Sequence, residues 1–412
     1  MVKSIPVTTE QLYAHYRRCS VITTDSRKIP PGSIFFALKG ENFNGNLFAA
    51  QALEKGAAFA VVDDPAMSQD QRYLLVHNVL QSLQEIARTH RQQMHIPVIG
   101  ITGSNGKTTT KELIHAVLSS RYLTRSTSGN LNNHIGVPLT LLSIRPETEI
   151  AVIEMGANHP GEIAFLCELA RPTHGLITNI GKAHLEGFGS FEGIIRAKTE
   201  LYTFLRKNMG NVFLNAGDSL LAKYATGLPA IMYGLVAEAG TSGKIIWKKE
   251  EGRGKREEDG LSGVEITFPD GQKREVISSL FGSYNALNLL AAAAVGYHFD
   301  IPPLDIAASL EACIPANNRS QIYRSERNLL VLDAYNANPS SMSAALHDFD
   351  RSFQGNNVVI LGDMLELGKE SEDEHLAILG ILEKLNFDKV FLIGPIFSKL
   401  NKNPDWITFE DT

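Results

Sequence analysis

The stretch that decides the fold is Gly100-Ile-Thr-Gly103-Ser-Asn-Gly106-Lys107-Thr108-Thr109-Thr110, which separates the apolar run Pro97–Thr102 from a run with helical spacing, Lys107–Ser119. A glycine-rich turn between a strand and a helix is the setting of a phosphate-binding loop. Backbone amides and the helix N-terminus attract phosphate oxygens, Lys107 neutralises the β and γ phosphates, and Thr108 offers a hydroxyl to Mg²⁺. Position 101, which the longer motif requires to be glycine, is isoleucine, so the shorter G-x-x-G-K-T pattern applies. We predict nucleotide binding here; the alternative is a glycine turn without a nucleotide.

Strands and helices alternate on both sides of this loop. The central segment predicts strands at Ala151–Met155 and Gly175–Thr178, and helices at Gly161–Leu169 and Phe191–Arg206. Such alternation is typical of a parallel sheet covered on both faces. Around residues 243–277 the pattern changes to alternating strands that flank the charged run KKEEGRGKREED (248–259), which we interpret as a solvated loop.

Two smaller α/β units are predicted beside the central one. The first ends near His95 and the other begins near Ile314. The expected strands are Ile34–Leu38, Phe59–Val62 and Tyr73–Val76 in the first unit, and Leu329–Asp333, Val358–Leu361 and Val390–Ile393, all three buried and parallel, in the last. The expected helices are Leu47–Lys55, Gln81–Arg91, Ser340–Phe353 and Ser371–Leu385. The chain stops at Thr412 after the strand-like Trp406–Phe409, so we expect the last unit to be incomplete.

The composition excludes several classes of protein. The 412 residues are 43% hydrophobic and 20% charged, which is ordinary for a folded chain. A net charge of −6 gives no basic field for nucleic acid. Cys19, Cys167 and Cys313 stand far apart, as in a reducing compartment. Met1–Ser20 lacks a signal-peptide core, and the longest apolar run is far too short for a membrane span, so we expect a soluble, cytoplasmic protein.

Of three polar residues that follow the loop, only Glu154 stands by itself in a position that suits a metal site. Glu154 ends a predicted strand, at the sheet edge where ligands gather, and a carboxylate there suits Mg²⁺. An acidic helix cap is the alternative for Glu154. His184 also follows a strand, whereas Lys198 lies on a predicted helix and by itself resembles a solvated lysine.

These motifs together resemble the Mur ligase family. The resemblance runs from about Thr23 onward and is carried by Thr24-Asp-Ser-Arg27, Phe35-Phe-Ala-Leu-Lys-Gly40, Gly103–Thr110, Gly129-Asn-Leu-Asn-Asn133, Ile135-Gly-Val-Pro-Leu-Thr140, Glu154-Met-Gly-Ala, Ala197-Lys198-Thr-Glu200, Asn285 with Asn288, Asp333-Ala-Tyr-Asn-Ala-Asn-Pro339 and Leu361-Gly-Asp-Met-Leu-Glu-Leu-Gly368. The loop and Glu154 mark the superfamily. The last two stretches point to the member that adds D-alanyl-D-alanine to UDP-N-acetylmuramoyl-tripeptide in peptidoglycan synthesis.

The resemblance implies an α/β fold of three domains and an ATP-dependent amide-bond ligation. The domains would be residues 1–95 for the UDP-sugar, 96–313 for ATP with a small β insertion, and 314–412, a Rossmann-like domain incomplete at its end. ATP and two Mg²⁺ ions are the implied cofactors. UDP-N-acetylmuramoyl-tripeptide and D-alanyl-D-alanine are the implied substrates, with no nucleic acid or membrane partner. We expect a monomer.

The resemblance also implies a role for each site residue. Those expected to act in catalysis are Lys107, Glu154, His184 and a carbamylated Lys198, of which the last three join Thr108 as magnesium ligands. Those expected to bind ATP are Gly103, Ser104, Asn105, Gly106, Lys107, Thr108, Thr109, Asn285, Asn288, Arg319 and Asp333. Those expected to bind the other substrates are Asp25, Ser26, Arg27, Lys39, Asn130, Asn133, Tyr335 and Asn336.

Two positions depart from the family pattern, and other functions stay open. Tyr284 stands where the family often has histidine, and Gly45-Asn46 lacks a histidine that the first domain tends to carry. The alternatives are a ligase that adds the third residue of the stem peptide, a folylpolyglutamate synthetase-like enzyme, and a nucleotide-binding scaffold without catalysis.

Overall fold

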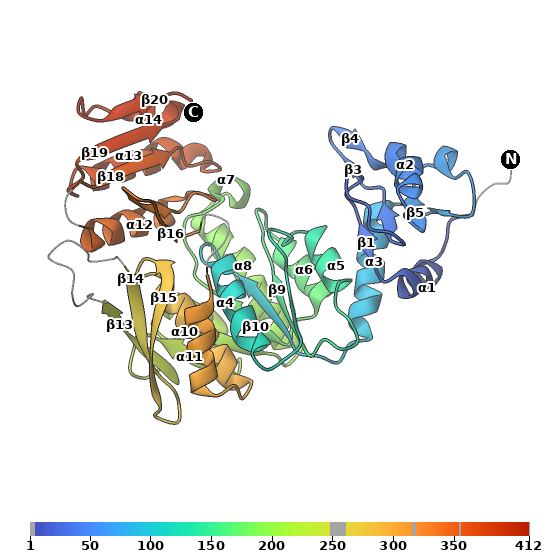
Figure 1. The fold of residues 1–412 in the computed structure, drawn as a ribbon, viewed down its shortest axis with the longest axis horizontal. Coiled ribbons are helices and arrows are strands. Elements are labelled where there is room, and N and C mark those ends of the chain that lie inside the picture. Colours follow the sequence, from blue (N-terminus) through green and yellow to red (C-terminus); the bar gives the residue numbers. More distant parts are fainter. Residues whose placement is uncertain (1–4, 248–260, 315–318, 354–355, 412) are drawn as a thin grey trace. The chain divides into compact units, whose positions relative to one another are not determined.

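The computed structural model describes residues 5–247, 261–314, 319–353 and 356–411, so the predicted charged loop at 248–259 lies outside the described residues. The chain forms two compact units (Figure 1). One comprises residues 1–100, 123–155 and 164–172, and the other comprises residues 101–122, 156–163 and 173–412. The boundary between them along the chain falls inside strand β7 (Val98–Thr102). Within the described residues, no helix has the length and apolar character that crossing a membrane requires.

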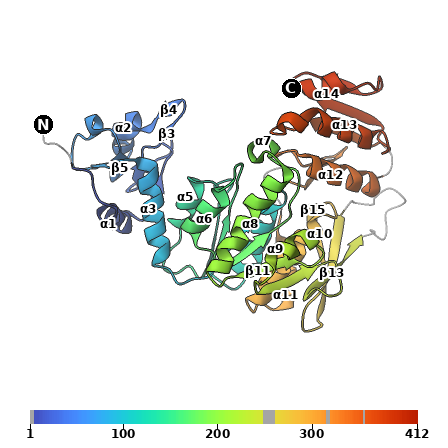
Figure 2. The same ribbon diagram turned by 180° about the vertical axis from the view of Figure 1, so that it is seen from behind.

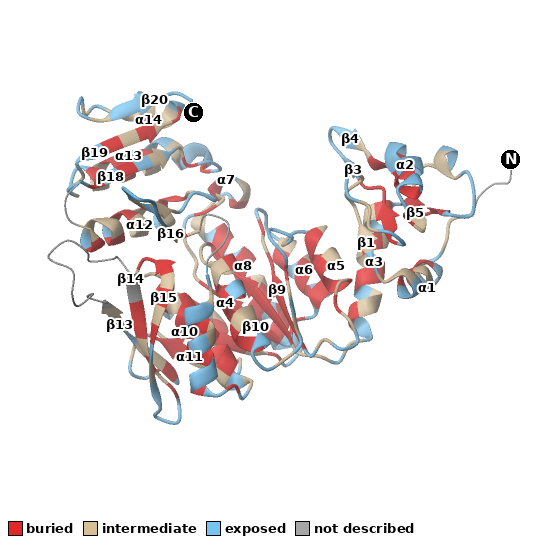
Figure 3. Cartoon of the chain, in the orientation of Figure 1, coloured by how far each residue is buried: buried red, intermediate tan, exposed pale blue. Residues whose placement is uncertain are grey.

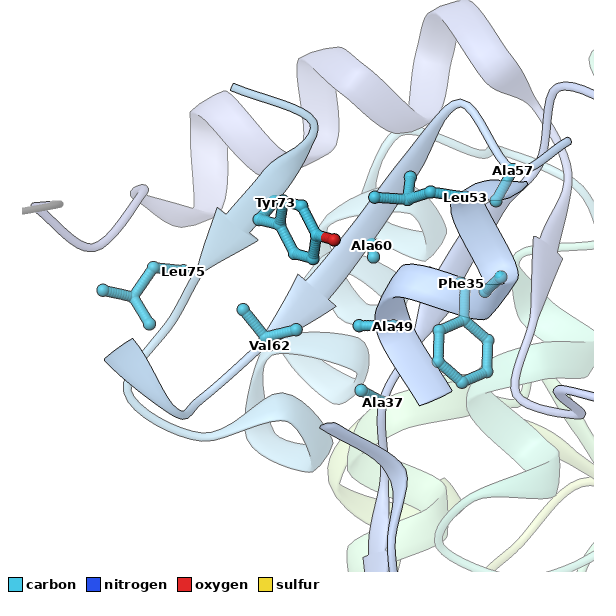
Figure 4. Packing of buried hydrophobic residues seen from close by; sticks show 10 residues of the cluster. Phe35, Ala37, Ala49, Leu53, Ala57, Ala60, Val62, Tyr73 and Leu75 are labelled. Atoms are coloured by element: carbon cyan, nitrogen blue, oxygen red, sulfur yellow. The ribbon is translucent and has the colours of Figure 1, made fainter. Parts of the chain in front are cut away.

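The first unit begins with a small parallel sheet in the order β1-β2-β5-β6. Its core packs the sheet against α2, with Phe35, Leu53 and Tyr73 among the buried side chains (Figure 4). The elements of this part are α1 (Thr9–Cys19), β1 (Ile22–Thr23), β2 (Ile34–Phe36), β3 (Lys39–Gly40), β4 (Phe43–Asn44), η1 (Gly45–Phe48), α2 (Ala49–Glu54), β5 (Phe59–Val62), η2 (Pro65–Met67), β6 (Tyr73–Leu75) and α3 (Val79–Gln92). The predicted small α/β unit is confirmed.

The helix α1 was not predicted, although its start carries a sequence signal. The Thr8 hydroxyl accepts a hydrogen bond from the Gln11 backbone amide, and the Gln11 side chain accepts one from the Thr8 amide. This is a capping box, and its S/T-x-x-E/Q spacing is readable in the sequence. Leu12, Tyr13 and Tyr16 form the buried face of this otherwise polar helix.

The first unit also holds a parallel pair of strands from the central part of the chain. β8 (Thr124–Ser126) pairs in parallel with β9 (Ile150–Glu154), and α5 (Gly136–Leu141) lies between them in the chain. α6 spans Glu162–Ala170. Strand β9 is buried along its whole length, as predicted for a strand of a covered parallel sheet.

In the second unit β10, β11, β12 and β13 pair in parallel, and the sheet then continues with antiparallel pairings through β14, β15, β16 and β17. Helices α4, α10 and α11 lie on one face of this sheet, and α8 and α9 lie on the other (Figure 1, Figure 2). The elements are α4 (Lys107–Ser119), β10 (His174–Ile177), α7 (Leu185–Phe188), α8 (Phe191–Lys207), β11 (Asn211–Asn215), α9 (Ser219–Ala225), β12 (Ala230–Gly234), β13 (Thr241–Trp247), β14 (Leu261–Thr267), β15 (Lys273–Phe281), α10 (Asn285–His298), α11 (Pro303–Ala312), β16 (Gln321–Arg324) and β17 (Leu329–Leu332). The parallel α/β arrangement with a β insertion is confirmed.

The C-terminal part of the second unit has its own parallel sheet in the order β18-β19-β20. Its helices α12 and α14 each pack beside α13. The elements are α12 (Pro339–Ser352), β18 (Val358–Gly362), η3 (Gly368–Glu370), α13 (Ser371–Leu382), β19 (Lys389–Ile393), α14 (Pro395–Leu400) and β20 (Ile407–Phe409).

Two predictions for this region are wrong in detail. β17 pairs antiparallel with β16 instead of joining the parallel C-terminal sheet, because a tight turn at Ser325–Asn328 connects them and a parallel pair needs a long crossover. The strands β18 and β19 are also not buried on both faces (Figure 3). Leu392 is fully buried, whereas Ile360 is 66% exposed. Among the described residues, the neighbouring helices cover only one face of this sheet.

Candidate active site

The phosphate loop has the backbone that its glycines predict. Gly103 and Gly106 have φ angles of +143° and +78°, a region that side chains disfavour. A Cβ at Gly103 would lie 2.0 Å from the Thr178 hydroxyl oxygen, and one at Gly106 would lie 2.8 Å from Asn288 Oδ1. Both positions therefore require glycine, and the loop leads directly into the N-terminus of α4. A loop of this shape presents amides and a helix dipole to an anion.

Lys107 lies over the loop it follows. Its Nζ donates hydrogen bonds to the backbone oxygens of Gly103 at 2.8 Å and Ser104 at 3.0 Å. Thr108 is buried in the first turn of α4, while Thr109 is half-buried. The lysine charge is thus held beside the amides that would receive phosphate oxygens.

Residues that sequence analysis missed hold the loop in place. The Thr178 hydroxyl donates to the Asn105 backbone oxygen at 2.6 Å, and the Asn179 amide group donates to the same oxygen at 3.0 Å. The Asn105 backbone amide donates to Asn179 Oδ1 at 3.1 Å. The Ser104 hydroxyl also donates to the Gly181 backbone oxygen at 2.9 Å. Thr178 ends a predicted strand and Asn179 directly follows it, so their position at the sheet edge was a usable signal.

The second unit brings His184 and Lys198 within electrostatic range of Lys107. His184 has a φ angle of 55°, in the left-handed region, and immediately precedes α7. Its Nδ1 contacts the Glu366 carboxylate. Burial lowers the pKa of His184, and the Glu366 carboxylate opposes that shift. Strained backbone at a polar residue of this kind is common at functional sites.

Lys198 is a buried amine on α8 and not the solvated lysine that its local sequence suggests. It is 1% exposed, its Nζ donates to the Ala157 backbone oxygen at 3.3 Å, and it lies 5.2 Å from the centre of the Phe188 ring. Burial, together with repulsion from Lys107, lowers the pKa of Lys198 to about 7. A large fraction of this amine is therefore neutral near pH 7, which is the form that reacts with CO₂.

Glu154 lies in the first unit, at the end of strand β9, and is 1% exposed. Its Oε1 accepts a hydrogen bond from Asn132 Nδ2 at 2.8 Å, and its backbone amide donates to the Thr127 hydroxyl at 2.9 Å. Asn132 was not among the predicted site residues. The predicted Asn133 lies just before α5, and its Oδ1 accepts hydrogen bonds from the backbone amides of Ile135 and Gly136. Asn130 is exposed in the preceding turn.

The two asparagines predicted to bind adenine are buried at the start of α10. Asn288 Oδ1 accepts from the Thr110 hydroxyl at 3.0 Å, and its Nδ2 donates to Asn285 Oδ1 at 2.8 Å. Asn285 Nδ2 donates to the Phe281 backbone oxygen at 2.7 Å. The pair therefore ties α10 to the helix that carries the phosphate loop.

Arg319, Asp333, Tyr335 and Asn336 also lie in the second unit. The Arg319 guanidinium stacks 3.5 Å from the centre of the Tyr335 ring, which is 50% exposed. Asp333 Oδ1 accepts from the Ser320 backbone amide at 3.1 Å, and its Oδ2 accepts from the Tyr284 hydroxyl at 3.4 Å. Asn336 is exposed. Tyr284, the departure from the family pattern, thus contacts a residue expected to bind ATP.

In the first unit, the predicted UDP-sugar residues Asp25, Ser26 and Arg27 follow strand β1, and Lys39 begins strand β3. Arg27 forms a two-pronged ion pair with Asp25, with distances of 2.9 and 3.0 Å, and this partner lowers the pKa of Asp25 to about 2. The Ser26 backbone oxygen accepts a hydrogen bond from Lys55. The Lys39 ammonium forms an ion pair with the Asp63 carboxylate at 2.8 Å, and Asp63 also accepts a hydrogen bond from Asn46. Sequence analysis did not identify Asp63 as the partner of Lys39.

Of the side chains predicted to hold Mg²⁺, Thr108 and Glu154 carry oxygen donors, whereas His184 offers a ring nitrogen and Lys198 an amine. A carboxylate and a hydroxyl are the oxygen donors that Mg²⁺ prefers. A protonated Lys198 would repel the ion, whereas a carbamate on its buried amine would supply further oxygens. Among the described residues, no three His, Cys, Asp or Glu side chains form a metal-holding group. Phosphate oxygens and water would supply the remaining oxygen ligands that Mg²⁺ prefers.

Sequence comparison identifies relatives of this chain along almost its whole length. Residues 18–102 match the model "Mur ligase family, catalytic domain", residues 101–296 match "Mur ligase middle domain", and residues 318–406 match "Mur ligase, glutamate ligase domain". The UDP-N-acetylmuramoyl-tripeptide–D-alanyl-D-alanine ligase of Bacillus subtilis is 37% identical over 380 residues, which cover 91% of this chain and 80% of the relative.

Solved structures of MurF enzymes are similar to this chain in fold. The crystal structure of MurF from Acinetobacter baumannii has a TM-score of 0.85 and 31% identity, and the match covers 99% of this chain and 90% of that one. MurF from Thermotoga maritima in complex with ADP has a TM-score of 0.82 and 27% identity, over 95% of this chain and 88% of that one. From these matches in sequence and in fold we conclude that the chain belongs to the Mur ligase family.

Proposed function

We propose that this chain is the ATP-dependent ligase that joins the terminal carboxylate of UDP-N-acetylmuramoyl-tripeptide to the amine of D-alanyl-D-alanine in peptidoglycan precursor synthesis. The observation that carries the proposal is the phosphate loop, in which Lys107 donates hydrogen bonds to two backbone oxygens of the loop. Relatives of the chain are named for this activity. A scaffold without catalysis would not require Lys107, His184 and Lys198 within electrostatic range of one another.

The chemistry follows from the weakness of a carboxylate as an electrophile. The carboxylate oxygen attacks the γ-phosphorus of ATP, the bond to the β-phosphate oxygen breaks, and ADP leaves. The dipeptide amine then attacks the acyl carbon, the carbon–oxygen bond to phosphate breaks, and the amine loses its proton. Positioning and charge neutralisation are the main tasks of the protein. Lys107 and the loop amides hold the transferred phosphoryl group and lower the repulsion between the two anionic reactants.

Mg²⁺ would neutralise phosphate charge and polarise the γ-phosphoryl group. We propose that two Mg²⁺ ions bind and that Thr108, Glu154, His184 and Lys198 hold them. In this proposal Lys198 is carbamylated. The burial of Lys198 and the lowered pKa of its amine support the carbamate, because CO₂ adds only to a neutral amine. The Lys107 charge nearby would in turn stabilise the anion that forms.

The remaining assignments complete the proposal. Residues 96–313 bind ATP through Gly103–Thr109, with Asn285 and Asn288 at the adenine. Arg319 and Asp333, which lie in residues 314–412, contact phosphate and ribose. Residues 1–95 bind the UDP-sugar through Asp25, Ser26, Arg27 and Lys39, and residues 314–412 form the third domain. Asn130, Asn133, Tyr335 and Asn336 contact the peptide substrates. We propose a monomer in the cytoplasm, where ATP and UDP-linked precursors are available.

The test is a product screen with purified protein. ATP and Mg²⁺ are supplied with UDP-N-acetylmuramoyl peptides of two and three residues or with a folate. D-alanyl-D-alanine, a single amino acid such as a diamino acid or glutamate, or no amine is then added, and the masses of the products are measured by mass spectrometry. The proposal predicts a pentapeptide product that requires both the tripeptide and the dipeptide. A product from the dipeptide precursor and a single amino acid would instead support the third-residue-adding ligase. Extension of a folate by glutamate would support the folylpolyglutamate synthetase-like alternative.

A further inference from the structure

The phosphate loop is hydrogen bonded to a residue more than two hundred positions away. Asn338 Nδ2 donates to Asn105 Oδ1 at 2.6 Å, and Asn105 Nδ2 lies 3.4 Å from Asn338 Oδ1. Asn338 is 7% exposed. Asn105 is the loop residue whose backbone Thr178 and Asn179 hold, so the point from which its side chain reaches Asn338 is fixed.

Asn338 is also the N-cap of helix α12. Its Oδ1 accepts from the Ser341 backbone amide at 3.0 Å, and its own backbone amide donates to the Ser341 hydroxyl at 3.2 Å. Capping needs only the oxygen of the side chain. The amide group is therefore left for Asn105, and the choice of asparagine over serine or aspartate at this cap is explained by the phosphate loop. The start of α12 also lies close to the chain at Gly181, where a Cβ would lie 2.9 Å from the Ser340 hydroxyl oxygen.

The six residues 333–338 are thus attached at both ends to elements that carry the proposed ATP site. At one end Asp333 accepts from the Tyr284 hydroxyl, next to the asparagine pair of α10. At the other end Asn338 is bonded to the loop. Between these attachments Tyr335 and Asn336 are exposed. A segment fixed at its ends and open in its middle can transmit a change at the loop to the groups it presents.

We propose that Asn338 is a positioning residue that couples nucleotide occupancy of the phosphate loop to the 333–338 segment. When a nucleotide phosphate orders the loop, the Asn105–Asn338 pair orders Tyr335 and Asn336 for the peptide substrate. This inference rests on the proposed ATP site, and it adds a linkage between nucleotide and dipeptide binding. Coupling between two sites typically changes an affinity by about fivefold to 150-fold.

The test compares Asn338→Ser with Ser341→Ala in the full chain, with ADP as the probe. Serine keeps the capping oxygen but removes the amide bonded to Asn105, whereas Ser341→Ala weakens the cap and leaves the Asn105 pair intact. Amide hydrogen exchange is followed in the loop, residues 103–108, and in residues 335–337, because Asp333 is itself proposed to contact the nucleotide. In the natural protein and in Ser341→Ala, ADP should slow exchange in both stretches. In Asn338→Ser, ADP should slow exchange in the loop alone, and KM for D-alanyl-D-alanine should rise about tenfold with kcat for the first half-reaction unchanged.

The outcomes separate this inference from the proposed function. If ADP slows exchange in the loop but not in residues 335–337 of the natural protein, the coupling is overturned and the ATP site stands. If ADP slows neither stretch, the ATP site and the coupling both fail. A second single variant, Asn105→Ala, removes the same hydrogen bond from the other side and keeps the cap of α12, and a double variant combines it with Asn338→Ser. The double variant should lose no more coupling than Asn338→Ser alone, and additive losses would overturn the paired role.

Discussion

Replacing Lys198 with methionine should make the protein more stable and inactive. Methionine has a similar length and no charge, so it fills the space around Phe188 without a buried amine. A lysine pKa of about 7, in place of 10.5, means that burying Lys198 at pH 7 costs about 4 kcal/mol at most. Lys198→Met removes this cost and should raise the free energy of unfolding towards that amount. Lys207→Met, at an exposed position of the same helix, is the control and should change stability by less than about 0.5 kcal/mol.

The pH dependence of this gain has a definite sign. The folded-state pKa of Lys198 is depressed, so the unfolded chain binds more protons between pH 7 and 10.5, and natural-protein stability rises with pH across that window. The advantage of Lys198→Met should therefore be fully present below pH 7 and shrink by about 2 kcal/mol between pH 7 and pH 9. Urea denaturation in CO₂-free buffer without Mg²⁺ or nucleotide measures it. A destabilised variant, or a difference that stays constant with pH, would refute the burial argument.

Three further substitutions test the site. Lys107→Ala should abolish phosphate release with little change in thermal melting, because it removes charge at the loop and no core packing; near-normal turnover would remove the phosphate-loop assignment. Asn288→Ala should weaken ATP binding by about 1–3 kcal/mol, measured by calorimetry, since it leaves buried partners unpaired, and it should spare UDP-sugar binding. Lys198→Ala should lose most activity and regain part of it with acetate or formate, whereas Lys198→Arg should not respond because a guanidinium takes up no CO₂. Full activity of Lys198→Ala would contradict the proposal that Lys198 is carbamylated.

The sequence predicted those parts of the site that depend on local pattern. The phosphate loop was readable because its glycines, its lysine and the helix start at Lys107 all lie within a few residues of one another. Strands such as β5 and β9 were readable because their residues form short, continuous apolar runs between turn residues. The helix α1 carried a cap signal at Thr8, but its polar composition concealed the buried face.

What the sequence could not predict depends on contacts between distant positions. Nothing near Lys198 indicates that it is buried, because that burial arises from packing against other elements. The pair of Asn105 and Asn338 joins residues from two separate stretches, and neither stretch implies the other. The strand β17 was assigned to the wrong sheet because its composition suits either pairing, and only the short turn before it decides.

The most direct measurement of the central claim follows an oxygen atom. The substrate is UDP-N-acetylmuramoyl-tripeptide labelled with ¹⁸O in its terminal carboxylate. It is converted with ATP and D-alanyl-D-alanine, and the ¹⁸O content of the released phosphate is measured by mass spectrometry. An acyl-phosphate intermediate transfers one labelled oxygen to phosphate for each amide bond formed. Label in AMP, or phosphate that carries no label while the amide product forms, would contradict the account.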